Sequence, residues 1–176
     1  MASTILLRGH LENGRIECGS AAMAAGTGMV STTIKNVAYA AATYSSAPAA
    51  GHQLWTSAAI NGGDNVIFRD AGTSGSISYV IIGDLAGSKY GGWYGKFGNL
   101  KMEIGTARMV AGSCDLKTNC NQIEFAHWTY FEAPGTCNQS FFTNARATRE
   151  SGSYITVKDT NMNALSAGFR YLILGE

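Results

Sequence analysis

The chain has 176 residues, of which 14% are charged and 45% are hydrophobic, and its formal net charge at pH 7 is +1. Soluble domains usually contain about 25% charged residues, so we expect part of this surface to be buried against other subunits. The near-neutral balance without a basic cluster excludes nucleic acid and anionic membrane surfaces as expected partners, and the apolar stretches are too short to span a bilayer.

Short runs in which apolar and polar residues alternate follow one another along the chain, and such runs are typical of β-strands. In the first half they are RIECG, TIKNVAYA, NVIFRD and SISYVIIGD, at 15–19, 33–40, 65–70 and 76–84. In the second half they are KMEIG, QIEFAHW, QSFFTNA, YITVKD and GFRYLILGE, at 101–105, 122–128, 139–145, 154–159 and 168–176. The alanine- and glycine-rich segments 20–30 and 106–117 show neither a regular polar face nor helix caps, so we expect loops there, with room for a short helical turn. The pattern predicts an all-β protein.

The second half of the chain repeats the first at a distance of 86 residues. From Gly9 to Gln53, 15 of 45 positions are identical to the residue 86 positions later, whereas chance would match about a tenth. The identical positions are Gly9, Asn13, Glu17, Gly19, Ala21, Met23, Ala25, Gly26, Thr32, Ala40, Thr43, Tyr44, Ala47, Pro48 and Gln53. Farther along, insertions fall between the apolar runs, as expected if the runs are strands and the gaps are loops. We therefore expect two homologous units, residues 1–87 and 88–176, each a small sandwich of about six strands.

The succession of HLENGRIECG, the strand that leads to Pro48, VIFRD and SISYVIIG resembles H-type lectins, the snail-agglutinin family. The second unit, with FEAP and GFRYLILGE, is similar to the versions of this module at the ends of phage tail fibres. The resemblance implies two tandem six-stranded antiparallel β-sandwiches of H-type lectin-like topology. It also implies a homotrimer that binds sugars in grooves between protomers, with cell-surface glycans and other virion proteins as partners.

The resemblance assigns candidate sugar contacts one residue at a time. The family's basic contact corresponds to Arg69 in the first unit and Lys158 in the second, and an aspartate follows each of them, Asp70 and Asp159. A cation beside a carboxylate can hold sugar hydroxyls because charged groups make the stronger hydrogen bonds. The same pair is also an ordinary feature of a strand end, and both interpretations stay open. The family's acidic contact has a match only in the second unit, at Asp115.

An aromatic cluster, KYGGWYGKFGN, lies at the junction of the two units and contains Trp93 and Tyr94. Exposed rings there could stack on sugar faces. Their place at a domain boundary favours packing between the units instead. A second aromatic group lies on or near a strand, and we expect core packing for at least half of its members: Phe125, Trp128, Tyr130 and Phe131.

The four cysteines do not follow the repeat and include no CxxC pair, and the three histidines show no metal-ligand spacing. We therefore expect no metal site and no cofactor. Cys18 is expected to be a small buried apolar group. Cys114 and Cys120 bracket the short segment DLKTN, which permits a loop-closing disulfide if the protein works outside the reducing cytosol. No nucleophile elbow, phosphate-binding glycine loop or HExxH motif is present, so we do not expect an enzyme.

Two classes of function remain as hypotheses. The first is a carbohydrate-binding, receptor-binding or adhesive component of a phage virion, such as a tail fibre. The second is a structural virion protein, such as a head decoration or tail protein, that keeps the lectin-like fold without sugar binding. The first residues, MASTILLRGH, lack the features of a secretory signal, which favours virion assembly over secretion and predicts a virion or extracellular location.

Overall fold

The computed structural model describes residues 3–11, 14–45, 55–57, 65–70, 74–85, 92–130, 141–143, 154–159 and 167–176. Every regular element in these ranges is a β-strand, which confirms the all-β prediction. A helix of the length and apolarity that a bilayer requires does not occur in them. The chain divides into two compact units, Met1–Ala86 (unit 1) and Gly87–Glu176 (unit 2).

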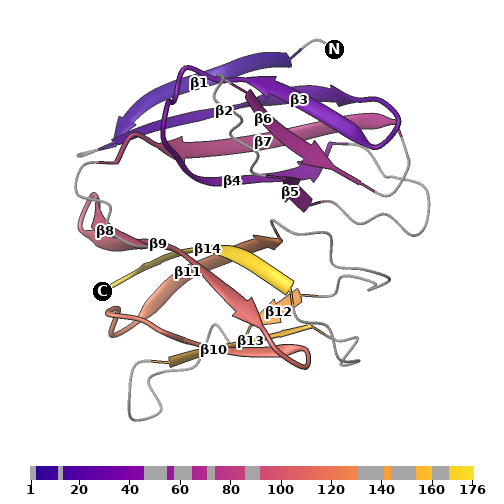
Figure 1. Ribbon diagram of the computed structural model, residues 1–176. Helices are drawn as coiled ribbons and strands as arrows, with labels where there is room; N and C mark the ends of the chain where they lie inside the picture. The colour runs from indigo at the N-terminus through magenta and orange to yellow at the C-terminus, as the bar shows by residue number, and fades with distance from the viewer. Residues whose placement is uncertain are drawn as a thin grey trace. The chain divides into compact units, whose positions relative to one another are not determined.

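Unit 1 has seven strands within its described residues, and they form two antiparallel sheets that lie one over the other (Figure 1). The four-stranded sheet has the order β1-β2-β7-β4, and the three-stranded sheet has the order β3-β6-β5. The strands are β1 (Ser3–Leu11), β2 (Gly14–Met23), β3 (Thr27–Ser31), β4 (Val37–Tyr44), β5 (Trp55–Ser57), β6 (Asn65–Arg69) and β7 (Gly75–Gly83).

Unit 2 repeats this arrangement strand for strand. Its four-stranded sheet has the order β8-β9-β14-β11 when listed from the first strand of the unit, and its three-stranded sheet has the order β10-β13-β12. The strands are β8 (Gly92–Phe97), β9 (Leu100–Met109), β10 (Ser113–Lys117), β11 (Ile123–Tyr130), β12 (Phe141–Thr143), β13 (Tyr154–Asp159) and β14 (Ala167–Gly175).

The prediction of six strands per unit is wrong by one strand. The strands β3, β5 and β10 have no counterpart among the predicted runs. The same is true of β1 and β8, which form hairpins with β2 and β9 and lie at an edge of each four-stranded sheet. The glycines of β8 have low β-propensity, so its sequence does not stand out as a strand. β8 is nevertheless a strand because its backbone N–H and C=O groups pair with those of β9.

The ladders have the same register in both units. On β3 and β6, Thr27 pairs with Arg69, and on β10 and β13 the residue 86 positions after Thr27, Ser113, pairs with Lys158. Both units also have a β-bulge at the start of an equivalent strand, between Val37 and Tyr39 on β4 and between Ile123 and Phe125 on β11. The two halves therefore share details of strand pairing as well as strand order.

The segments 20–30 and 106–117, expected as loops, are strands joined by tight turns. Ala25 and Gly26 have φ angles of 47° and 73°, and the equivalent Ala111 and Gly112 have 50° and 72°. Positive φ at both central residues is the signature of the type I′ hairpin turn. In unit 1 the turn is closed by Ala24 and Thr27, whose amides donate to each other's carbonyls at 2.9 and 3.0 Å. Along β2 buried and more exposed residues alternate despite its alanines and glycines, and β9 is a strand because it pairs with β8 and β14.

The core of unit 1 lies between its two sheets. Inward residues of β2, β3, β6 and β7 pack together, and the rings of Phe68 and Tyr79, from opposite sheets, have centroids 6.2 Å apart. In unit 2 the predicted core positions of Trp128 and Tyr130 are confirmed because both side chains are buried. Phe125 is exposed instead, and Phe131 lies outside the described residues. Each sandwich thus leaves one face of its three-stranded sheet outside the core.

Candidate functional site

Arg69 lies on the outer face of the three-stranded sheet of unit 1. Alternate residues of β6 point in opposite directions, so Val66 and Phe68 enter the core while Arg69 is exposed. Its register partners are Thr27 on β3 and Trp55 on β5. The Arg69 side chain therefore lies on the outer face of the middle strand, β6, between β3 and β5.

Asp70 does not join Arg69 on this face. Its side chain is only 5% exposed, and its carboxylate accepts a hydrogen bond from the Tyr44 hydroxyl. The Asp70 amide also donates to the Gly26 carbonyl at 2.9 Å. Successive residues of an extended chain point to opposite faces, which explains why the two neighbours diverge. The predicted cation–carboxylate pair is therefore not assembled on the surface of unit 1.

In unit 2 the equivalent position belongs to Lys158, which pairs with Ser113 on β10 and with Phe142 on β12. The side chains of Lys158 and Asp159 lie outside the described part of the structure. Asp115 is exposed on β10 and pairs with Thr156. Because Thr156 is two residues from Lys158 on β13, Asp115 and Lys158 occupy diagonal positions of one ladder, which are typically about 7–8 Å apart. The register thus brings these two predicted contacts to the same region.

Trp93 and Tyr94 belong to β8, where they pair with Ile104 and Glu103 of β9. They are thus part of the four-stranded sheet and do not belong to the sheet that contains Lys158. Their side chains are outside the described residues, so stacking on a sugar and packing at the unit boundary stay predictions.

The predicted disulfide is absent, because Cys114 and Cys120 are both free. Cys114 lies in β10, and Cys120 lies in the loop that follows this strand. Cys120 is buried next to Glu103. Burial raises the pKa of both thiols, so they are protonated at neutral pH. Cys18, expected to be buried, is only half-buried.

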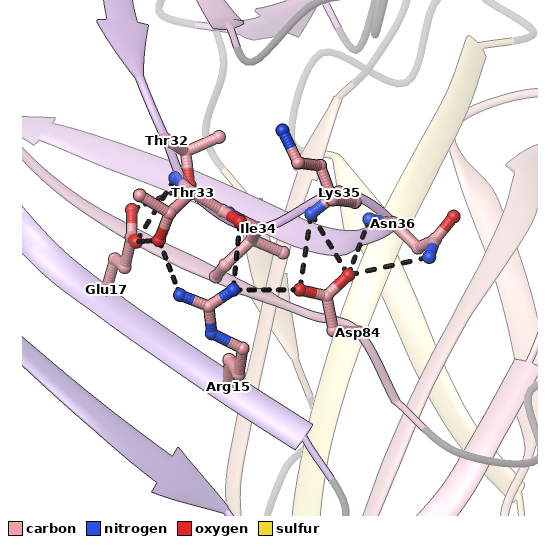
Figure 2. A network of polar contacts seen from close by, with 8 residues as sticks. All are labelled: Arg15, Glu17, Thr32, Thr33, Ile34, Lys35, Asn36 and Asp84. Atoms are coloured by element: carbon pink, nitrogen blue, oxygen red, sulfur yellow. Dashed lines mark hydrogen bonds and ion pairs between the residues drawn. The ribbon is translucent and has the colours of Figure 1, made fainter.

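A buried glutamate, which the sequence analysis did not single out, organises the loop of residues 32–36 before β4 (Figure 2). Glu17 on β2 is 0% exposed. The Thr32 hydroxyl donates to its Oε2 at 2.6 Å, and the Thr33 hydroxyl and amide donate to its Oε1 at 2.5 and 3.3 Å. A buried carboxylate requires such donors because it has lost its hydration. The loop is therefore attached to the central part of the sheet.

Arg15 and Asp84 hold the outer side of the same loop, as Figure 2 shows. The Arg15 guanidinium donates to the Thr33 carbonyl at 2.9 Å and lies 3.3 Å from an oxygen of Asp84. The amides of Lys35 and Asn36 donate to the Asp84 carboxylate at 3.0 and 2.8 Å. Partial desolvation raises the pKa of Asp84, but these amides and Arg15 outweigh it and hold the pKa below its usual value.

Unit 2 contains the equivalent acid, Glu103 on β9, but with fewer partners. Glu103 is 1% exposed, and its Oε1 accepts from the Asn119 amide at 2.6 Å, while its Oε2 has no hydrogen-bond partner among the described residues. Asn119 stands where unit 1 has Thr33, so the second hydroxyl donor is missing. The sequence did contain a signal for this pair of sites, since the identical positions of the repeat include Glu17, a charged residue within a strand, and Thr32 in the loop.

These observations distinguish loop anchoring from surface recognition. The Glu17 and Asp84 groups are occupied by the loop that they fix, whereas the outer faces of the three-stranded sheets present exposed side chains. No group of three or more histidines, cysteines or acids within the described ranges is arranged to hold a metal ion. No protein-family model, curated protein or solved structure matches the chain.

Proposed function

We propose that the chain is a carbohydrate-binding, receptor-binding or adhesive component of a phage virion, built from two H-type lectin-like sandwiches that each carry an additional edge strand. The observation that supports this most is the equivalence of Arg69 and Lys158. Arg69 is the last residue of β6 and Lys158 the last but one of β13, each the middle strand of a three-stranded sheet, and both pair with the first residue of a neighbouring strand, Thr27 or Ser113. A cation kept at one register position in two otherwise divergent repeats fits a shared binding role.

The proposed assembly is a homotrimer in a virion or an extracellular setting. Its support is the low charge of the chain, 14%, which leaves much surface that water solvates poorly. Shallow sugar sites are weak individually, and copies of Arg69 and Lys158 on every protomer would raise the avidity without new contacts. The trimer and the sugar sites are therefore parts of one hypothesis.

The second candidate is a structural virion protein that has the same fold without sugar binding. Met29, next to Thr27 on the outer face of the sheet, is 40% exposed, and its register partner Ile67 is half-buried. An apolar pair beside Arg69, together with the inward Asp70, fits a contact between proteins better than a hydroxyl-binding groove. These residues make the second candidate specific enough to test.

A glycan array on the whole chain tests the first candidate. Arg69→Ala and Lys158→Ala are each expected to weaken binding roughly tenfold or more, because hydrogen bonds to charged groups are the stronger ones. Lys117→Ala is the matched control, since Lys117 is an exposed cation on the same sheet as Lys158. Mass by light scattering should stay that of a trimer in all variants.

Two results would contradict this hypothesis in different ways. If the wild type binds glycans and both substitutions leave binding unchanged, these cations are not the contacts and the sugar site lies elsewhere. If the wild type binds no glycan and no cell surface, the structural virion function replaces the first candidate. A monomer mass at micromolar concentration would remove the trimer.

A further inference from the structure

Two aromatic rings of unit 2 lie exposed on strand β11, outside the region of Lys158. Phe125 is 47% exposed, and His127 is exposed as well. Their ring centroids are 6.4 Å apart and their planes differ by 6°. Residues two apart on a strand share a face, so the two parallel rings follow the strand direction. This ring pair contrasts with Trp128 and Tyr130 on the same strand, which are buried.

The ring pair stands at the edge of a sheet. Among the described strands, β11 pairs only with β14, where Leu174 is the register partner of Phe125 and Leu172 that of His127. Register partners of an antiparallel pair share a face, so the two leucines are the apolar neighbours of the rings on β14. A ligand could thus reach the rings from the side of β11 that no described strand covers.

Hydrogen-bonding groups lie directly before the rings. The Gln122 side-chain amide donates to the Glu124 carboxylate at 2.7 Å, and both side chains are exposed. The bulge between Ile123 and Phe125 leaves Glu124 outside the regular pairing. A carboxylate and an amide that already orient each other offer several acceptors and donors in a fixed arrangement. Planar polar groups of this kind suit the hydroxyls of a sugar.

Unit 1 lacks this arrangement although the backbone is equivalent. The residues 86 positions before Glu124, Phe125 and His127 are Ala38, Tyr39 and Ala41, and both Tyr39 and Ala41 are buried. Asn36, the counterpart of Gln122, directs its side-chain amide to Asp84 at 3.5 Å. The ring pair and its polar neighbours are therefore specific to unit 2.

From this placement we propose that Phe125 and His127, with Gln122 and Glu124, form a second carbohydrate-contact surface. The apolar face of a pyranose would stack on the rings, and its hydroxyls would bond to the amide and the carboxylate. This inference rests on the proposed carbohydrate-binding function, and it assigns to the same class of ligand a contact that needs neither Arg69 nor Lys158.

The size and charge of the surface favour a small ligand over a protein. A stable protein interface needs about 800 Å² on each partner, while a single aromatic side chain buries only about 150–250 Å². Partial desolvation lowers the pKa of His127, so its imidazole is neutral at neutral pH, and a stacked ligand need not desolvate a cation. The flanking Gln122 and Glu124 are polar, which also fits a sugar better than an apolar partner.

Titration of the whole chain with methyl glycosides of galactose, glucose, N-acetylgalactosamine and N-acetylglucosamine tests the inference by NMR. At least one glycoside is expected to shift the ring signals of Phe125 and His127. Phe125→Leu keeps an apolar side chain but removes the ring, and should weaken that binding roughly three- to tenfold. Phe125→Tyr keeps the ring and should bind like the wild type. Val110→Ala is the control, because Val110 is another apolar residue of unit 2, 61% exposed.

Each other outcome overturns the inference. If glycosides or glycans bind but Phe125→Leu binds them as tightly as the wild type, the ring pair is not a contact while the proposed function stands. If Phe125→Leu changes only the mass in light scattering, the surface meets a second copy of the chain. If neither glycosides nor the glycan array show binding to the wild type, the proposed function and this inference fail together.

Discussion

The two units hold the same loop with the same buried acid but satisfy that acid differently. In unit 1 two hydroxyls and an amide, from Thr32 and Thr33, donate to Glu17. In unit 2 one amide, that of Asn119, donates to Glu103, and the Cys120 thiol lies 3.9 Å from the same oxygen. The other oxygen has no hydrogen-bond partner within the described part of the chain. Elsewhere the loops agree: the amides of Ile34 and Cys120 donate to the hydroxyls of the equivalent threonines, each at 3.1 Å.

The backbone contact between the loop and the end of the strand is the same in both units, whereas the side-chain contacts of the buried acid differ. Asp84 and Glu176, at the ends of β7 and β14, both donate their amides to the loop, to the carbonyls of Asn36 and Gln122 at 2.9 and 2.8 Å. A Cβ added at Gly83 or Gly175 would collide with these same carbonyls. The close contact between loop and strand end is thus common to both units. The side-chain donors to the buried acid are where the repeats have diverged.

The largest expected effect comes from removing the acid in each unit. Glu17→Ala leaves the buried hydroxyl of Thr32 and the donors of Thr33 without their acceptor, and should destabilise unit 1 by roughly 3–5 kcal/mol. Glu103→Ala removes one good hydrogen bond together with an unsatisfied oxygen, and should cost unit 2 only about 1–2 kcal/mol. Hydrogen exchange of the amides of β2 and β9 in the intact chain reports the two units separately.

The comparison breaks if the two substitutions have equal effects on their own units, or if Glu103→Ala costs more. In a Trp55→Phe background the two remaining tryptophans, Trp93 and Trp128, both belong to unit 2, so their fluorescence during denaturation gives a second measure of that unit. Protection of β9 should stay at the wild-type level in Glu17→Ala, because the acid and its donors all belong to unit 1.

The sequence predicted the repeat and most long strands because these depend on patterns that one chain shows directly. The β-branched and aromatic run Val66–Phe68 is enough to identify β6. The alternation of a strand then places Arg69 on the face opposite to Phe68. The direction of Asp70 also follows from this alternation once the strand continues through it. What the sequence could not supply was the partner of Asp70, because Tyr44 is on a different strand and only the packed sandwich brings the two together.

The loops at 20–30 and 106–117 were predicted incorrectly for a related reason. Alanine and glycine have low β-propensity, and their composition hides the two-residue turn at Ala25 and Gly26. Of the four aromatics between 125 and 131, at least half were expected in the core; Trp128 and Tyr130 are buried there, whereas Phe125 is exposed. Residues 125 and 128 lie on opposite faces of a strand, but the segment alone does not show which face meets the core. Ladder register and tertiary contacts, which decide both features, are not encoded in a single segment.

Exchanging the residues at the equivalent positions 33 and 119 should change the stability of each unit by a smaller amount. Asn119→Thr would restore a hydroxyl next to Glu103 and should stabilise unit 2 by about 1 kcal/mol, while Thr33→Asn should destabilise unit 1 by about 1–2 kcal/mol. Chemical denaturation combined with hydrogen exchange at β9 and β2 measures the two changes. A gain in unit 2 that also occurs with Asn119→Val would show that packing rather than the hydroxyl is responsible.

The smallest expected effect concerns the type I′ turns, where the units agree. Ala25 and Ala111 have φ angles of 47° and 50°, a region that alanine enters at a cost and that asparagine tolerates better. Ala25→Asn and Ala111→Asn should therefore each stabilise their own unit by roughly 0.5–1 kcal/mol, because the backbone and the closing hydrogen bonds stay unchanged. Thermal unfolding of both single variants measures the gain, and Ala24→Asn, next to the turn but outside its two central positions, is the control. Since the strain is the same in both turns, gains that differ by more than a factor of two would show that the β2–β3 and β9–β10 connections are not equivalent, even though their dihedral angles agree.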